Sequence, residues 1–163
     1  MSSSASDKVR RFYKRFSVDD RVLIVINADP DAIACAMAVK RLLWRKVASV
    51  TISNINIINR PDNIAMIRLL GVPLIFIDEV DLNQFSRFVI VDSQPDHSEA
   101  YGRFTSDVII DHHPEKINPD PEKTSRSVFK DIRPQYGATA TIMTEYLRAA
   151  KIKPSAKLAT GLF

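Results

Sequence analysis

The sequence predicts an α/β domain with a mostly parallel β-sheet and helices on both faces, and three observations support this fold class. The chain has 163 residues, a length that suits one compact domain with a sizeable core. Residues 22–26 are an almost continuous β-branched run, which is typical of a strand buried on both faces. Similar short apolar runs alternate with helical stretches along the chain, and this alternation favours a parallel sheet.

Five apolar runs and a late or edge strand make up the expected sheet, at residues 22–26, 50–55, 74–77, 88–91, 108–110 and 128–132. Helices are expected at residues 32–46, 63–70 and 137–150, and a last one begins at Ser155. In the first of these, Ala34 and Ala38 lie one turn apart and permit close packing on the sheet, while Gly71 ends the second. Residues 114–125 are polar and contain proline, which indicates a surface loop.

The chain divides into residues 1–20, a flexible tail with a helix, and one main domain at residues 21–163. The basic residues of the first helix are interpreted as a solvated face rather than a phosphate-binding stripe: Lys8, Arg10, Arg11, Lys14 and Arg15. The sequence stops within an apolar helical pattern that lacks a cap, so we expect a domain cut from a longer protein.

The composition, with 45% hydrophobic and 26% charged residues, is that of an ordinary globular protein. No apolar run reaches the roughly 20 residues that a membrane helix needs, and the N-terminus lacks the apolar core of a signal peptide. We therefore expect a cytoplasmic protein without membrane contact. The one cysteine, Cys35, excludes an internal disulfide and a multi-cysteine zinc site, and is expected to be a packed thiol. The net charge of +4 is compatible with a phosphorylated substrate.

Acidic and imidazole side chains follow three of the expected strands. Asp29 and Asp31 come after the first strand, Asp92 after the fourth, and Asp111-His112-His113 after the fifth. Because the carboxyl ends of parallel strands meet at one edge of an open sheet, these side chains are expected to converge there. Such a group repels itself or buries charge unless a cation joins it. Its oxygen and nitrogen donors suit Mn²⁺ first, with Mg²⁺ as a less specific choice.

Ordinary structural roles are the alternatives for the same residues. Asp29 and Asp31 precede a helix, where aspartate is a favoured N-cap. His97 is interpreted as a loop histidine, and Arg133 as a solvated side chain. Trp44, with Met37 at helical spacing from it, is interpreted as a core or interface residue.

Together these motifs resemble those of the DHH phosphoesterases. Asp29-Pro30-Asp31-Ala32, Asp92 and Asp111-His112-His113 match the first three motifs of that family in order, strand-end placement and spacing. Residues 137–141, Gly-Ala-Thr-Ala-Thr, resemble the helix start that follows the third motif. The family includes single-strand exonucleases, oligoribonucleases, cyclic dinucleotide phosphodiesterases and exopolyphosphatases. The resemblance covers residues 21–163 and implies a Rossmann-like domain.

The resemblance also implies roles for individual residues. The metal ligands would be Asp29, Asp31, Asp92 and His112, with Asp92 able to bridge two metals. His113 would contact the substrate phosphate, and Asp111 would orient a neighbouring histidine rather than bind metal. For Gly137 and Thr139 two alternatives stay open from the residues themselves: a plain helix start, or backbone amides that hold a substrate phosphate. The attacking group would be hydroxide bound to the metal, so the protein would need no nucleophile of its own.

The reaction implied by this resemblance is metal-dependent hydrolysis of a phosphodiester or phosphoanhydride bond in a nucleotide-like molecule or short oligonucleotide. Val25 occupies a position where the oligoribonuclease-like branch has a histidine, and a fourth-motif aspartate and a C-terminal substrate-binding domain are expected beyond Phe163. The alternative is therefore a non-catalytic nucleotide-binding or regulatory module with a degenerate metal site. A homodimer stays open. The sequence contains no Gly-x-Gly-x-x-Gly motif and no phosphate-binding loop, which argues against the common nucleotide folds.

Overall fold

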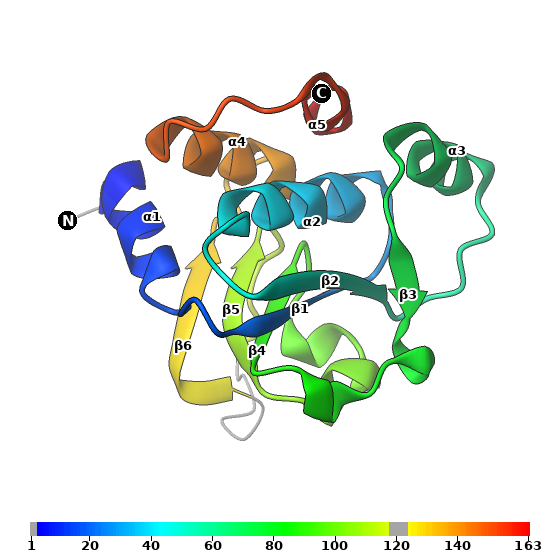
Figure 1. The fold of residues 1–163 in the computed structure, drawn as a ribbon, viewed down its shortest axis with the longest axis horizontal. Helices are drawn as coiled ribbons and strands as arrows, with labels where there is room; N and C mark the ends of the chain where they lie inside the picture. The colour runs from blue at the N-terminus through cyan, green and yellow to red at the C-terminus, as the bar shows by residue number, and fades with distance from the viewer. Residues whose placement is uncertain (1–2, 118–123) are drawn as a thin grey trace.

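A six-stranded sheet forms the centre of the structure, a computed structural model that describes residues 3–117 and 124–163 (Figure 1). Its strands are β1 (Arg21–Ile26), β2 (Ser49–Asn54), β3 (Leu74–Phe76), β4 (Arg87–Val91), β5 (Ser106–Asp111) and β6 (Thr124–Ile132). Their order is β3-β2-β1-β4-β5-β6, and each of the described pairs is parallel. The predicted fold class is therefore confirmed, and the expected late strand is the parallel edge strand β6.

The strand order reverses between β1 and β4. The chain runs outward from β1 through β2 to β3 and then returns to place β4 against the other side of β1. Ligands of open parallel sheets bind beyond the carboxyl ends of the strands at such a reversal. Segments that follow β1 and β4 are thus neighbours, although about 60 residues separate them along the chain.

Helices cover both faces of the sheet, but unequally. The α-helices are α1 (Ala5–Tyr13), α2 (Pro30–Leu43), α3 (Pro61–Leu70), α4 (Thr139–Ala149) and α5 (Ala156–Leu162), and Figure 1 shows them on one side of the sheet. Short 3-10 helices occur at η1 (Ile77–Glu79), η2 (Leu82–Gln84), η3 (Pro95–His97) and η4 (Glu99–Arg103). Tyr101 of η4 is buried against the opposite face. In the part of the chain that the structure describes, no helix is long and apolar enough to cross a membrane.

Alternate residues of the strands β1, β4, β5 and β6 pack into two separate cores, as the pleat of a strand requires. Val22, Ile24 and Ile26 of β1 pack with α2 and α4 in the larger core. Leu23 and Val25 point to the other face and pack with Tyr101 in the smaller one. These strand residues are fully buried. Val25 is therefore a core residue of the face that lacks α-helices.

Helix α1 is an integral part of the larger core. Phe12 is fully buried and makes edge contacts with the rings of Phe129 and Tyr146, with centroids 6.3 and 6.0 Å away. The Nζ atom of Lys8 lies 2.7 Å from Oδ1 of Asp131 in β6. The prediction of a wholly solvated basic face is thus wrong for Lys8, because this side chain neutralises a buried carboxylate.

Other expectations are corrected in detail. The third strand ends at Phe76, because Ile77 begins η1, and Gly71 ends α3 with the predicted left-handed conformation, at a φ of 62°. The surface loop predicted at residues 114–125 is shorter, since Thr124 and Ser125 already belong to β6, while residues 118–123 lie outside the described part. Trp44 is 58% exposed, which excludes a core role.

Candidate active site

Asp92 stands at the centre of the site, directly after β4. Its φ of 57° lies in the left-handed region, which a residue with a side chain seldom adopts. The backbone N–H donates to the carbonyl of Ile110 at 2.9 Å, so the pairing with β5 continues through this strained residue. The buried carboxylate accepts a hydrogen bond from the Thr139 hydroxyl at 2.7 Å. Such strained residues concentrate at functional sites, where the surrounding structure holds them in place.

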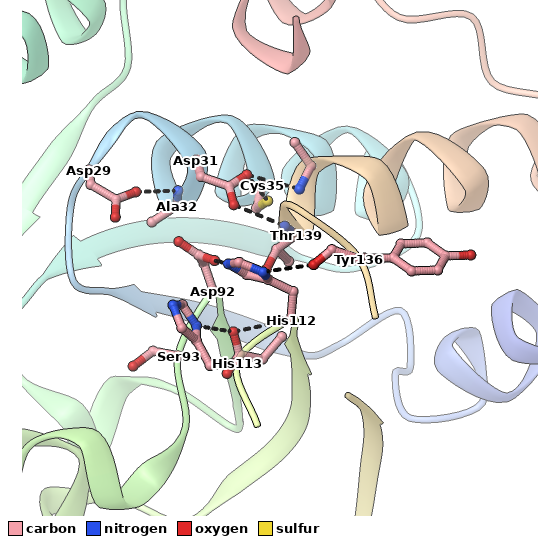
Figure 2. Close-up of polar contacts among 12 residues, drawn as sticks. Asp29, Asp31, Ala32, Cys35, Asp92, Ser93, His112, His113, Tyr136 and Thr139 are labelled. Carbon is pink, nitrogen blue, oxygen red and sulfur yellow. Dashed lines mark hydrogen bonds and ion pairs between the residues drawn. The ribbon is translucent and has the colours of Figure 1, made fainter. Parts of the chain in front are cut away.

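His112 and His113 follow β5, and both use Nδ1 for a hydrogen bond within the protein. Nδ1 of His112 donates to the backbone carbonyl of Tyr136 at 3.1 Å, and Nδ1 of His113 donates to Oδ1 of Asp111 at 2.8 Å. A ring that carries its proton on Nδ1 has a free lone pair on Nε2, the atom that binds a metal. Nε2 of His112 lies 3.6 Å from Oδ1 of Asp92. Figure 2 shows the two side chains facing each other.

Asp111 is fully buried beneath the two histidines. Its Oδ1 accepts hydrogen bonds from the His112 N–H at 2.8 Å and from the His113 ring. Its Oδ2 accepts one from Nε2 of Gln94 at 2.7 Å, and the same nitrogen donates to the carbonyl of His113 at 2.9 Å. Both carboxylate oxygens of Asp111 therefore accept hydrogen bonds from neighbouring residues of the site. This geometry suits a carboxylate that orients a histidine, as the resemblance implies.

Asp29 and Asp31 lie beside this group at the start of α2 (Figure 2). Asp29 is the N-cap of α2, and its Oδ1 accepts from the N–H of Ala32 at 2.8 Å. Asp31 instead caps α4: its two oxygens accept from the N–H groups of Thr139 and Ala140, each at 2.9 Å. The capping alternative is thus confirmed for Asp29 alone, whereas Asp31 caps a helix 108 residues away instead of the one that it begins.

The carboxylates repel one another strongly. Burial, together with the negative charges of Asp31, Asp29 and Asp111, raises the pKa of Asp92 to about 8, although the hydrogen bond from Thr139 works against the rise. Burial, together with the charge of Asp31, also raises the pKa of Cys35, which is a packed free thiol as predicted. A carboxyl group in this environment favours either a proton or a cation at its side.

The donor set fits a divalent cation. One ligand atom each from Asp92, His112 and His113 lies within 4.8 Å of the others. Among the described residues, Asp29 and Asp31 do not belong to this group, although their charges reach Asp92. One carboxylate oxygen and two imidazole nitrogens are ligands that Mn²⁺, Fe²⁺ and Zn²⁺ accept. The three predicted strand ends therefore meet, but the tight cluster includes His113 and leaves out the first motif.

The segment before α4 is arranged differently from the prediction. Thr139 is fully buried, with its hydroxyl on Asp92 and its N–H on Asp31, so it has no group left for a substrate. Gly137 is exposed. Arg133 is only 7% exposed, and the prediction of a solvated side chain is wrong because Asp131 and Glu145 surround its guanidinium group.

Sequence reasoning overlooked two contributors to the site, Gln94 and Tyr136. Gln94 holds Asp111, and its place two residues after Asp92 was the available signal. The backbone carbonyl of Tyr136 holds His112 and has no side-chain signature at all. The His97 ring, expected to be a loop histidine, lies edge-on to His113 with 5.7 Å between the ring centroids.

Comparisons with known proteins identify a family for the chain. The family model described as DHH family, N-terminal domain, matches residues 21–163. The uncharacterized protein MJ1633 of Methanocaldococcus jannaschii is 38% identical over 142 residues, which are 87% of this chain and 28% of that protein.

A solved structure shares the fold. The crystal structure of an exopolyphosphatase-related protein from Bacteroides fragilis superposes with a TM-score of 0.66 at 17% identity, over 99% of this chain and 49% of the other. This chain thus spans about a quarter of the curated relative and half of the solved one.

Proposed function

Since this chain belongs to the DHH family, we propose that it is the N-terminal domain of a phosphoesterase that hydrolyses a phosphodiester or phosphoanhydride bond with the help of a divalent metal. The substrate class is a nucleotide-like molecule or a short oligonucleotide. The single observation that carries the proposal is the meeting of Asp92, His112 and His113 within 4.8 Å at the carboxyl edge of the sheet.

The proposed metal ligands are Asp92 and His112, with Asp29 and Asp31 as further ligands. Oδ1 of Asp29 caps α2 and leaves Oδ2 without a hydrogen bond among the described residues, so this oxygen is the donor that the first motif can offer. Mn²⁺ is the expected ion because the donors mix oxygen with imidazole nitrogen, and Mg²⁺ is the alternative. A bound divalent cation activates water and neutralises charge on the phosphoryl oxygens.

The protein's own residues orient the reacting groups. His113 is half-exposed and is held by Asp111, so its Nε2 edge is the group proposed to contact the substrate phosphate. Asp111 accepts the hydrogen bond from Nδ1–H and so keeps the Nε2 edge of the ring turned toward the proposed substrate. The exposed Gly137 offers a backbone amide to the same substrate. Thr139 is proposed to position Asp92 instead.

The experiment is a titration of the protein with Mn²⁺, followed by assays on short oligoribonucleotides, cyclic dinucleotides and a chromogenic phosphodiester. Mn²⁺ at 100 times its dissociation constant is expected to stabilise the protein by about 2.7 kcal/mol. His112→Ala should lose most of this stabilisation. His97→Ala is the matched control, because His97 is near the site but outside the donor group.

A protein that neither gains stability with Mn²⁺ nor turns over any of these substrates would contradict the proposal. Binding of a nucleotide without turnover would instead favour the alternative of a regulatory module. The cytoplasmic location, the homodimer, and a fourth-motif aspartate with a C-terminal domain beyond residue 163 stay predictions.

A further inference from the structure

One short segment, Arg133–Ala140, touches three of the four proposed metal ligands, and we name it the positioning segment. The carbonyl of Tyr136 holds the ring of His112 at 3.1 Å. The N–H groups of Thr139 and Ala140 hold Asp31, and the hydroxyl of Thr139 holds Asp92. The orientation of these ligands therefore depends on where the positioning segment lies.

Arg133 anchors the positioning segment at its start. Nε and Nη2 of its guanidinium group donate to the two oxygens of Asp131 in β6, at 3.0 and 2.8 Å. Nη1 donates to Glu145 of α4 and to the hydroxyl of Tyr136, the latter at 3.1 Å. The Tyr136 hydroxyl in turn donates to Oε1 of Glu145 at 2.6 Å. A planar, bidentate arginine fork fixes the geometry of both partners.

Helix α1, which precedes the residues that match the family, adds a further contact to this anchor. Lys8 donates to Asp131 at 2.7 Å, the same carboxylate that receives the Arg133 fork. Lys8 precedes residue 21, where the family match begins. The chain outside the matched domain therefore contributes a charge to the group that supports the positioning segment.

We propose that Arg133 is a positioning residue of the metal site, acting through Tyr136 on His112, and that Lys8 of α1 supports it through Asp131. This inference rests on the proposed metal-binding function. A histidine ligand depends on the partner of its second nitrogen, and loss of such outer partners commonly costs about 10- to 100-fold in metal affinity. The carbonyl of Tyr136 can hold His112 in place only while its own residue is fixed.

The test compares Tyr136→Phe and Arg133→Lys with the wild type. Tyr136→Phe removes the hydroxyl that joins Arg133 and Glu145 but keeps the carbonyl, while Arg133→Lys keeps the charge and loses the fork. Arg87→Lys is the control, since Arg87 also bridges two aspartates, Asp20 and Asp107, at the opposite end of β4.

Two quantities are measured in the intact protein: the Mn²⁺ dissociation constant, from electron paramagnetic resonance of free Mn²⁺, and the tautomer of His112, from ¹⁵N NMR without metal. Both variants are expected to bind Mn²⁺ roughly 10-fold more weakly and to mix the two His112 tautomers, while the control keeps the wild-type values. Lys8→Gln should weaken binding by a smaller factor.

Unchanged affinity and an unchanged His112 tautomer in both variants, with only a lower melting temperature, would overturn the inference, because the network would then hold the fold alone. A wild type that binds no Mn²⁺ would contradict the proposed function instead. The tautomer comparison in the metal-free protein would still decide whether Arg133 positions His112.

Discussion

Two groups of carboxylates lie near neighbouring strands of the sheet, each around a buried aspartate, and their charges are balanced in opposite ways. Around Asp131, two carboxylates meet two cations: Lys8 and Arg133 pair with Asp131, and Arg133 also pairs with Glu145. Around Asp92, four aspartates gather, and in the described ranges no lysine or arginine forms an ion pair with them: Asp29, Asp31, Asp92 and Asp111. In the first group the positive and negative charges cancel. In the second group, within the described part of the chain, no lysine or arginine balances the negative charges.

The pKa values of the two groups express this difference. Burial alone would raise the pKa of Asp131, but hydrogen bonds from Arg133, Lys8 and Tyr146 outweigh it and hold this pKa below its ordinary value. Burial also raises the pKa of Asp92, and there the neighbouring charges push in the same direction. Burial alone therefore does not distinguish a carboxylate with a structural role from one with a proposed functional role. The distinguishing feature is whether a positively charged side chain lies beside the carboxylate.

Asp92→Asn is expected to have the largest effect. The amide is neutral, so turnover should fall by roughly 10³-fold, about 4 kcal/mol of transition-state stabilisation. The metal-free protein should become more stable at neutral pH, because folding no longer has to place a proton on a carboxyl group that is ionised in the unfolded chain. Turnover assays and thermal melts without metal measure the two effects. A less stable metal-free variant would show that the group around Asp92 is balanced after all.

Asp131→Asn tests the balanced group. It leaves Arg133 and Lys8 without their buried partner, so the free energy of unfolding should fall by about 3 kcal/mol. Urea denaturation measures this change. Asp107→Asn, which removes one partner of the more exposed Arg87, should cost about 0.5 kcal/mol and serves as the control. Equal losses in both variants would contradict the comparison.

The pH dependence separates the groups without mutation. The folded protein holds a proton on Asp92 up to about pH 8, whereas the unfolded chain releases it near pH 4. The metal-free protein should therefore lose stability as the pH rises between these values, by roughly 1.4 kcal/mol per pH unit, and Mn²⁺ should abolish the loss. Asp131 and Glu145, with lowered pKa values, lose their contribution as the pH falls. Melts from pH 4 to 8 with and without Mn²⁺ check this, and a flat metal-free profile would contradict it.

Thr139→Val is expected to have the smallest effect. It removes the hydrogen bond to Asp92 and should cost about 1 kcal/mol of stability. Mn²⁺ affinity should fall a few-fold, as calorimetric titration measures. Thr144→Val is the matched control on the same helix, since its hydroxyl bonds only to the backbone carbonyl of Ala140. An equal loss of Mn²⁺ affinity in Thr144→Val would show that the Thr139 hydroxyl has no specific role in metal binding.

The sheet and the aspartates and histidines at its edge could be predicted from the sequence because their signals are local. A β-branched run such as residues 22–26 predicts a buried strand, and a chemical side chain directly after it lies at the sheet edge. The role of Arg133 could not be predicted in this way. An isolated arginine between a strand and a helix is usually predicted to be solvated. Arg133 is buried because Asp131 and Glu145 pair with it, and Lys8 pairs with the same Asp131.

The individual contacts of the proposed metal ligands could not be predicted from a local sequence pattern either. Asp29 and Asp31 share one motif, yet the first caps its own helix and the second caps α4. The backbone carbonyl of Tyr136 carries no signal, because every residue has one. Such contacts depend on the packing of whole elements, which a single sequence does not specify residue by residue.

The hydrogen bond from Thr139 to Asp31 spans 108 residues, and that from Thr139 to Asp92 spans 47. Contacts of such long range are expected to form late in folding, since loop-closure entropy opposes them until the sheet is in place. The metal site would then be among the last parts of the molecule to assemble. In a refolding experiment, Mn²⁺ uptake would follow the recovery of helical circular dichroism and report the moment at which the chain becomes native.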